Sequence, residues 1–154
     1  MSNKSTQTSF NKEYHCIPNT CRDQHLPMAP RYASPFRNHG IRGLGLHEAA
    51  PPYEVRRLNF PWHLALITGS GHAEFECLGE VGVMEPGQIW VGPLETAYQY
   101  KAKDDWKFIS AALYRTHEFV HLEGKMLHRD LSHSTEPIIY AMEAYFQESA
   151  APER

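Results

Sequence analysis

Residues 67–78 read ITGSGHAEFECL and residues 85–94 read EPGQIWVGPL, and these two stretches decide the fold. Polar and apolar side chains alternate from His72 to Cys77, which is the period-two pattern of a strand with one buried face. Glycine pairs and a Pro-Gly turn interrupt the apolar segments. The stretches therefore predict a small antiparallel β-barrel built from short strands.

Working outward, the same pattern continues on both sides. We predict further strands at residues 41–47, 53–58, 62–68, 97–102 and 106–115. On the last of these, Trp106, Phe108 and Ser110 share one face, and Ile109 and Ala111 share the other. Both faces are largely apolar, so we expect this strand to be covered on both sides.

The chain divides into an N-terminal arm at residues 1–39, a barrel at 40–116 and a C-terminal helical segment at 117–154. The arm is polar and has neither helical nor strand periodicity. We therefore expect a mobile arm or an irregular wrap over the barrel.

The C-terminal segment contains a helical pattern. Ser134 or Thr135 can cap a helix that has Pro137 in its first turn, where the missing N–H costs nothing. One stripe at helical spacing then consists of Ile138, Met142, Tyr145 and Phe146. This stripe is predicted as a dimer interface, and packing against the barrel is the alternative.

The composition limits the classes of partner. The chain has 154 residues, a formal net charge of −3 and no Lys/Arg run longer than the Arg56-Arg57 pair, which gives no general reason to expect nucleic acid. It has no apolar stretch that could cross a membrane and no signal-peptide pattern near its start. Three cysteines fit a reducing compartment. We expect a soluble, cytoplasmic protein.

Aromatic and polar residues on the predicted strands supply the ingredients of a small-molecule pocket. The candidate ligand-binding residues are Arg56, Arg57, His63, Trp90, Tyr98, Tyr100, Phe108 and Ser110. The alternative is a filled barrel core with tyrosine hydroxyls at the rim. An arginine is difficult to place in such a core, because a buried arginine needs a partner such as Glu54 or a ligand.

The run from about Leu46 to Tyr114 resembles the N-terminal cupin-like sensor domain of AraC-type transcription regulators. The strand and G-x-G turn of that family correspond to residues 67–71, its P-G-D segment to 85–89, its F-P-P stretch to 91–94, and a segment often written with His and Tyr to 97–100. Gln88 stands where the family usually has Asp.

The resemblance implies a mainly β fold: a cupin-like antiparallel β-barrel, or double-stranded β-helix, with one or more C-terminal helices. It also implies that the barrel binds a small effector, that the arm folds over it, and that the helices form a homodimer. Family ligand contacts would fall on Tyr100, Phe108, Ser110 and one of the two arginines. Phe108 replaces a polar contact of the sugar-binding members, so an aromatic or apolar metabolite is favoured over a sugar. The helix-turn-helix units that bind DNA in that family are absent from this sequence.

A metal centre is not predicted, although the chain has ten histidines. Small barrels of the cupin type hold a metal with an H-x-H pair, a nearby Glu and a further His after the P-x-G turn. Here His72 has no second histidine beside it, and Tyr98 stands at the position of the last one. The arm residues His15, Cys16, Cys21 and His25 match no common zinc spacing.

No nucleophile elbow, phosphate loop or Cys-x-x-Cys motif is present, so we expect neither an enzyme nor a cofactor. The alternative function is a stand-alone cupin enzyme, a metal-dependent isomerase or oxygenase. Such an enzyme would need three ligands in the barrel, for example His63, His72 and His121.

Overall fold

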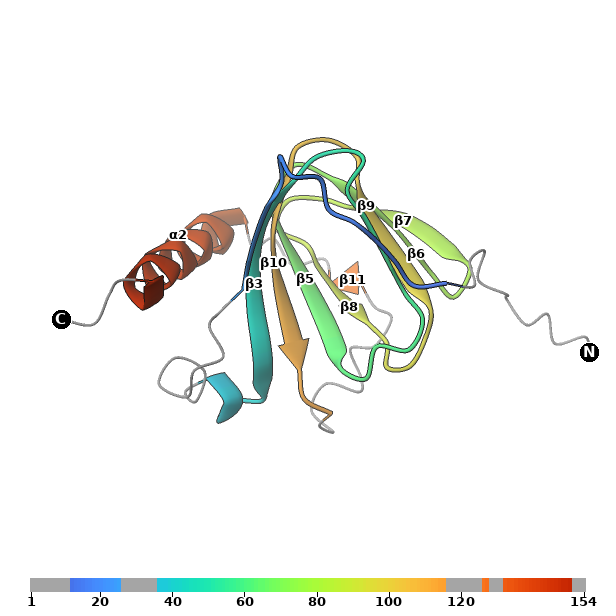
Figure 1. The fold of residues 1–154 in the computed structure, drawn as a ribbon, viewed down its shortest axis with the longest axis horizontal. Helices are drawn as coiled ribbons and strands as arrows, with labels where there is room; N and C mark the ends of the chain where they lie inside the picture. The colour runs from blue at the N-terminus through green and yellow to red at the C-terminus, as the bar shows by residue number, and fades with distance from the viewer. Residues whose placement is uncertain (1–11, 26–35, 116–125, 128–131, 151–154) are drawn as a thin grey trace, which may run out of the picture.

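The computed structural model describes residues 12–25, 36–115, 126–127 and 132–150, and within them strands form the bulk of the molecule (Figure 1). The elements, in chain order, are β1 (Tyr14–Cys16), β2 (Arg22–His25), β3 (Ile41–Ala49), β4 (Glu54–Arg57), β5 (His63–Ser70), β6 (Ala73–Cys77), β7 (Glu80–Met84), β8 (Ile89–Gly92), β9 (Tyr98–Ala102), β10 (Trp106–Leu113), β11 (Met126–Leu127) and α2 (Ser132–Ala150).

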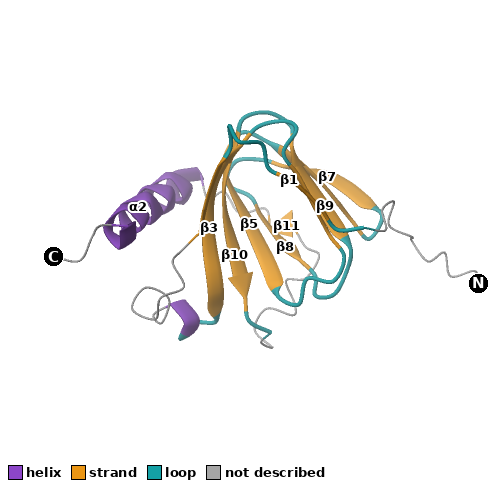
Figure 2. Cartoon of the chain, in the orientation of Figure 1, coloured by secondary structure: helices purple, strands orange, loops and turns teal. Residues whose placement is uncertain are grey.

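The strands form two antiparallel sheets that face each other. The smaller sheet has the order β1-β4-β9-β6-β7, and the larger has the order β11-β8-β5-β10-β3-β2. Figure 2 shows the two sheets converging at one end, with α2 outside the larger sheet. The predicted antiparallel barrel with a C-terminal helix is confirmed.

Strand β10 is covered on both faces, as its sequence predicts. Trp106 and Phe108 point into the barrel and are almost completely buried in its main core. Ile109 belongs to a second core cluster with Leu46 and Phe146, on the opposite face. The alternation along a single strand thus separates the interior from the layer beneath the helix.

The turn between β5 and β6 requires glycine. Gly71 has φ of +71°, and a Cβ at this position would lie 2.7 Å from the carbonyl carbon of Asp105. The neighbouring His72 donates its backbone N–H to the Asp104 carboxylate, at 2.6 Å. Both the left-handed backbone and the close approach of the next turn therefore exclude a side chain at residue 71.

The arm contains two strands that the sequence analysis missed. β1 pairs with β4 in the smaller sheet, and β2 pairs with β3 in the larger one. The arm therefore crosses from one sheet to the other, along the dark blue segment in Figure 1. Edge strands of three and four residues are too short for a periodic signal, and their pairing depends on the backbone of the partner strand.

Helix α2 begins at Ser132, so Pro137 lies inside it rather than in the first turn that was predicted. The helix packs on the outer face of the larger sheet, where Phe146 is 6% exposed and Met142 and Tyr145 contact the same cluster. For these three residues the packing alternative is observed; the side chain of Ile138 lies outside the described part. No helix of the described residues is long and apolar enough to span a membrane.

Candidate functional site

The closed part of the barrel interior is an aromatic stack. The rings of Trp106 and Phe108 lie parallel with centroids 3.6 Å apart, and Tyr98 lies between Trp90 at 5.0 Å and Tyr100 at 6.5 Å. Four of the predicted ligand-binding residues, Trp90, Tyr98, Tyr100 and Phe108, are therefore brought together, and each is at most 4% exposed.

The two adjacent arginines have different environments. Val55 is buried in the main core, so alternation along β4 directs Arg57 inward and Arg56 outward. The Arg56 Nε donates to Glu54 at 2.7 Å, and its guanidinium lies 4.8 Å from the Tyr14 ring. Of the two predicted arginines, Arg57 therefore belongs to the interior set and Arg56 to the outer surface.

Arg57 brings a positive charge to the interior aromatic residues. Its guanidinium lies 4.4 Å from the ring centre of Phe60. Burial raises the pKa of the Tyr100 hydroxyl, and Arg57 partly opposes that rise. Burial likewise raises the pKa of Tyr98. Both phenols therefore remain neutral hydrogen-bond donors at physiological pH.

Three buried donor atoms in this region have no hydrogen-bond partner among the described residues. They are the Arg57 Nε, the Tyr98 hydroxyl and the Trp90 Nε1. Arg57 and Tyr98 are register partners across β4 and β9, and the Trp90 and Tyr98 rings are in contact. Buried polar atoms are normally paired, so a group of unpaired donors is a place where a polar ligand atom can gain hydrogen bonds.

A second set of polar residues lies where the arm meets the larger sheet. The carboxylate of Asp23 on β2 contacts the His47 Nδ1 on β3, and its other oxygen is 3.3 Å from the His25 Nε2. The His47 Nε2 is 2.7 Å from the Ser110 Oγ on β10, and the His47 ring stacks on Phe108 at 4.4 Å. We call Asp23, His25 and His47 the arm cluster.

The two histidines of the arm cluster favour the ionised form of the Asp23 carboxylate. Hydrogen bonds from His25 and His47 hold the pKa of Asp23 well below its usual range. Hydrogen bonding to Asp23 raises the pKa of His25, whereas burial lowers the pKa of His47. The positive charge of Arg57 partly opposes the rise in the pKa of His25.

Glycines on β3 leave room for the arm cluster. Gly45 lies opposite both Ser110 and His25, and a Cβ there would overlap the His47 ring and lie 2.6 Å from the Ser110 Oγ. Two residues away on the same face, a Cβ at Gly43 would meet no atom of the described residues within 4 Å. Among the described residues, the inner face is therefore crowded at Gly45 and has free space at Gly43.

The remaining predicted positions do not join the interior set. His63 is fully buried and shares a strand face with Ala65, opposite the Leu64 that packs in the main core. His72 follows the other end of the same strand and pairs with Asp104 at 2.7 Å. A strand of this length separates the two histidines by roughly 25 Å, so the trio proposed for an enzyme is wrong in its first two members; His121 lies outside the described residues.

Sequence analysis did not identify the arm cluster. His25 was considered only with the arm cysteines, and Asp23 and His47 were not considered as ligands. The available signal was the D-x-H spacing at residues 23–25, which puts both side chains on one face if the segment is a strand. That condition could not be recognised before the pairing with β3 was known.

No family model matches this sequence, and no curated protein matches it. Solved structures do. A Cupin 2 conserved barrel domain protein from Salinispora arenicola has TM-score 0.51 and 15% identity, over 70% of this chain and 86% of that one. The Cupin_2 domain of an XRE family transcriptional regulator from Enterobacter cloacae has TM-score 0.50 and 14% identity, over 64% and 100%. KdgF from Halomonas sp. has TM-score 0.50 and 14% identity, over 71% and 93%. At such identities the likeness shows the fold alone, which is that of a cupin barrel.

Proposed function

We propose that this cupin barrel is the effector-sensing and dimerisation domain of an AraC-type transcription regulator, and not an enzyme. Contact with DNA would then require a helix-turn-helix unit outside this sequence, and the cytoplasmic location remains a prediction. The resemblance of residues 46–114 supports this proposal, as does the occurrence of the same fold in an XRE family regulator. One structural observation carries it, and that observation concerns strand β2.

Strand β2 contacts the interior with one face and the helix layer with the other. Asp23 and His25 lie on the inner face with His47. Arg22 lies on the outer face, where its guanidinium is 3.7 Å from Glu48 and 3.5 Å from Glu143 of α2. A sensor needs an element of this kind, because any shift of the strand at the inner site changes contacts with the helix.

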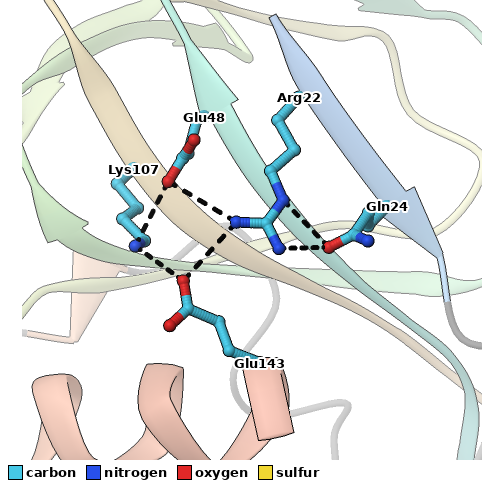
Figure 3. Close-up of polar contacts among 5 residues, drawn as sticks. All are labelled: Arg22, Gln24, Glu48, Lys107 and Glu143. Atoms are coloured by element: carbon cyan, nitrogen blue, oxygen red, sulfur yellow. Dashed lines mark hydrogen bonds and ion pairs between the residues drawn. The ribbon is translucent and has the colours of Figure 1, made fainter. Parts of the chain in front are cut away.

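The outer contacts form a connected ionic network, drawn in Figure 3. Lys107 on β10 lies 3.0 Å from Glu143 and 3.3 Å from Glu48, and Arg22 donates two hydrogen bonds to Gln24. Arm, barrel and helix are thus joined at one place. An effector that favours one position of β2 would transmit its differential binding energy to α2 through these contacts.

The interior indicates the chemistry of the effector. Arg57 provides a cation, Tyr98 and Trp90 provide unpaired donors, and Phe108 with Tyr100 provides aromatic surface. Donors and a cation select an acceptor-rich, anionic group, and the rings select an apolar or aromatic body. We therefore propose an aromatic or apolar metabolite that carries a carboxylate.

Thermal-shift and calorimetric titration of the full chain test this proposal. A panel of aromatic and aliphatic carboxylates is compared with the corresponding amides and with neutral sugars. We expect at least one carboxylate to raise the melting temperature, with its amide much weaker. Arg57→Gln should reduce that affinity roughly tenfold or more, since a charge-assisted hydrogen bond contributes about 1.5–3 kcal/mol.

Arg56→Gln is the matched control, because it removes the same charge one residue away on the outer face. The affinity of Arg56→Gln for the carboxylate should equal that of the wild type. Equal losses in the two variants would show a general charge effect and would contradict an interior site. A complete absence of binding across the panel would favour a filled structural barrel.

A second candidate function is a metal-dependent cupin enzyme, and the arm cluster is the observation that favours it. Two histidines and one carboxylate form the facial ligand set of many metal-dependent oxygenases. Iron or manganese bound stoichiometrically to protein as purified, with turnover of an organic substrate that depends on that metal, would support this alternative over the sensor.

A further inference from the structure

We propose that Asp23, His25 and His47 form a binding site for a divalent transition-metal ion of the zinc class, which holds the arm strand β2 against β3. One ligand atom from each of these residues lies within 4.8 Å of the other two. Both proposals involve strand β2, but Arg57 and the Tyr98 and Trp90 donors are not among the metal ligands, so metal titration and effector titration test the two proposals separately.

The donor types select the class of ion. Imidazole nitrogens suit zinc, nickel, copper and ferrous iron, whereas calcium and magnesium prefer oxygen ligands throughout. Ligand atoms about 2.0–2.1 Å from a tetrahedral ion lie roughly 3.3 Å from one another. Small side-chain movements from the present positions are therefore sufficient to surround one ion, and the fourth position can be filled by water.

His47, the buried metal ligand, is held in place by residues outside the arm cluster. The His47 side chain is only 5% exposed; its Nε2 contacts the Ser110 Oγ at 2.7 Å and its ring stacks on Phe108. These contacts direct its Nδ1 towards Asp23. A histidine ligand typically has its second nitrogen held in this way, which fixes both the tautomer and the ring orientation.

The other two ligands provide an entry path. The His25 side chain is 63% exposed and that of Asp23 is 25% exposed. Because these residues are on the arm and His47 is on the barrel, an ion bound to all three would connect the two segments. Metal binding would therefore stabilise the docked arm, and the stabilisation would increase with the concentration of free ion above the Kd.

The same residues could be interpreted as a Ser-His-Asp hydrolase triad, since Ser110, His47 and Asp23 are connected in that order. A triad also needs backbone N–H donors for the oxyanion. Around Ser110 the strand β10 is paired continuously with β3 on one side and β5 on the other. Its backbone donors are thus engaged in the sheets, and the metal site is the better interpretation.

The site is separate from the metal motif of small cupin-type barrels. In that motif the ligands lie on an H-x-H strand and after the P-x-G turn, where this chain has Tyr98. Tyr98 is buried among Trp90 and Tyr100. The arm cluster uses β2 and β3 instead.

The test is titration of the metal-stripped full chain with Co²⁺ and Zn²⁺. Co²⁺ should produce visible d–d absorption that saturates at one ion per chain, and Zn²⁺ should displace it. Calorimetry should show His25→Ala weakening Zn²⁺ binding at least tenfold. Ser110→Ala, which removes only the contact to the His47 Nε2, should weaken Zn²⁺ binding roughly tenfold. Limited proteolysis of residues 14–25 should slow when Zn²⁺ is added to the wild type, but not to His25→Ala.

His72→Ala is the matched control, because His72 and Asp104 form a similar histidine–carboxylate pair on the surface, without a third ligand among the described residues. It should leave Zn²⁺ affinity unchanged. The His25 side chain is 63% exposed, so the variant should fold and its circular dichroism spectrum should match that of the wild type. Absence of Co²⁺ absorption, or equal Zn²⁺ affinity in the wild type and His25→Ala, would overturn the proposal, as would a loss in His72→Ala equal to that in His25→Ala.

Discussion

The closed interior of this barrel and its mouth, which we define as the inner face at His47, Gly45 and Ser110, are built from the same strands in opposite ways. On β10, Trp106 and Phe108 fill the closed interior, whereas Ser110, further along the same face, is only partly buried. On β3, the inner face carries His47 opposite Phe108 and Gly45 opposite Ser110. Large rings fill the closed interior, and small and polar residues line the end where the arm strand β2 packs. The residues that contribute most to stability should therefore lie in the closed interior, and the proposed metal ligands lie at the arm.

The largest effect is expected in the closed interior. Trp106→Ala removes a ring that is 1% exposed, and it also removes the donor to the Thr68 Oγ1 at 3.1 Å. We expect the free energy of unfolding to fall by about 3–5 kcal/mol in urea titrations. Tyr140→Ala is the control: its side chain is 74% exposed on α2, so a change within about 0.5 kcal/mol is expected. Similar losses of unfolding free energy in the two variants would mean that the aromatic stack does not contribute more to stability than the exposed surface of α2.

This contrast also explains which parts of the structure could be predicted from the sequence. The two faces of β10 follow from alternation within eight residues, and the turn at Gly71 follows from local backbone geometry. Both are local properties of the chain. The barrel and the interior position of Tyr98, Tyr100 and Phe108 could be predicted for the same reason.

The mouth depends on contacts between residues that are distant in sequence. Asp23 and His47 are 24 residues apart, and His47 and Ser110 are 63 apart. The arm strand β2 has only four residues, and its register is set by β3. Neither periodicity nor a ligand motif records this pairing. The distinction between Arg56 and Arg57 likewise required the orientation of β4.

An intermediate loss of stability is expected at Gly45 on the inner face of β3. In Gly45→Ala the new methyl group would overlap the His47 ring and approach the Ser110 Oγ, so we expect a loss of about 1–3 kcal/mol in stability, measured by chemical denaturation. Gly43→Ala is the control on the same strand face, where the methyl group would meet no atom of the described part of the chain within 4 Å. Its stability should change little or rise slightly, because alanine restricts the unfolded chain. A larger loss of stability in Gly43→Ala than in Gly45→Ala would contradict the free space that the structure shows at Gly43.

The smallest effect is expected at the ionic contact between barrel and helix. The hydrogen bond from Lys107 holds the pKa of Glu143 below its usual 4.5 in the folded state. Glu143 therefore contributes stability above its unfolded pKa, and this contribution is lost as the pH falls through the lower folded value. Because both side chains are 28% exposed, solvent screening limits the contribution to about 0.5 kcal/mol or less.

Glu143→Gln removes the titrating carboxylate. It should therefore remove the part of the pH dependence of the unfolding free energy that comes from Glu143. The measurement is the free energy of unfolding of wild type and variant between about pH 6 and about pH 3. The difference between them should shrink towards low pH, because a protonated glutamic acid and a glutamine are both neutral at this position. A difference that grows on acidification would mean that the network in Figure 3 does not hold the helix through this carboxylate. The transmission route from β2 to α2 would then have to rest on the apolar contacts of Phe146 and Met142 instead.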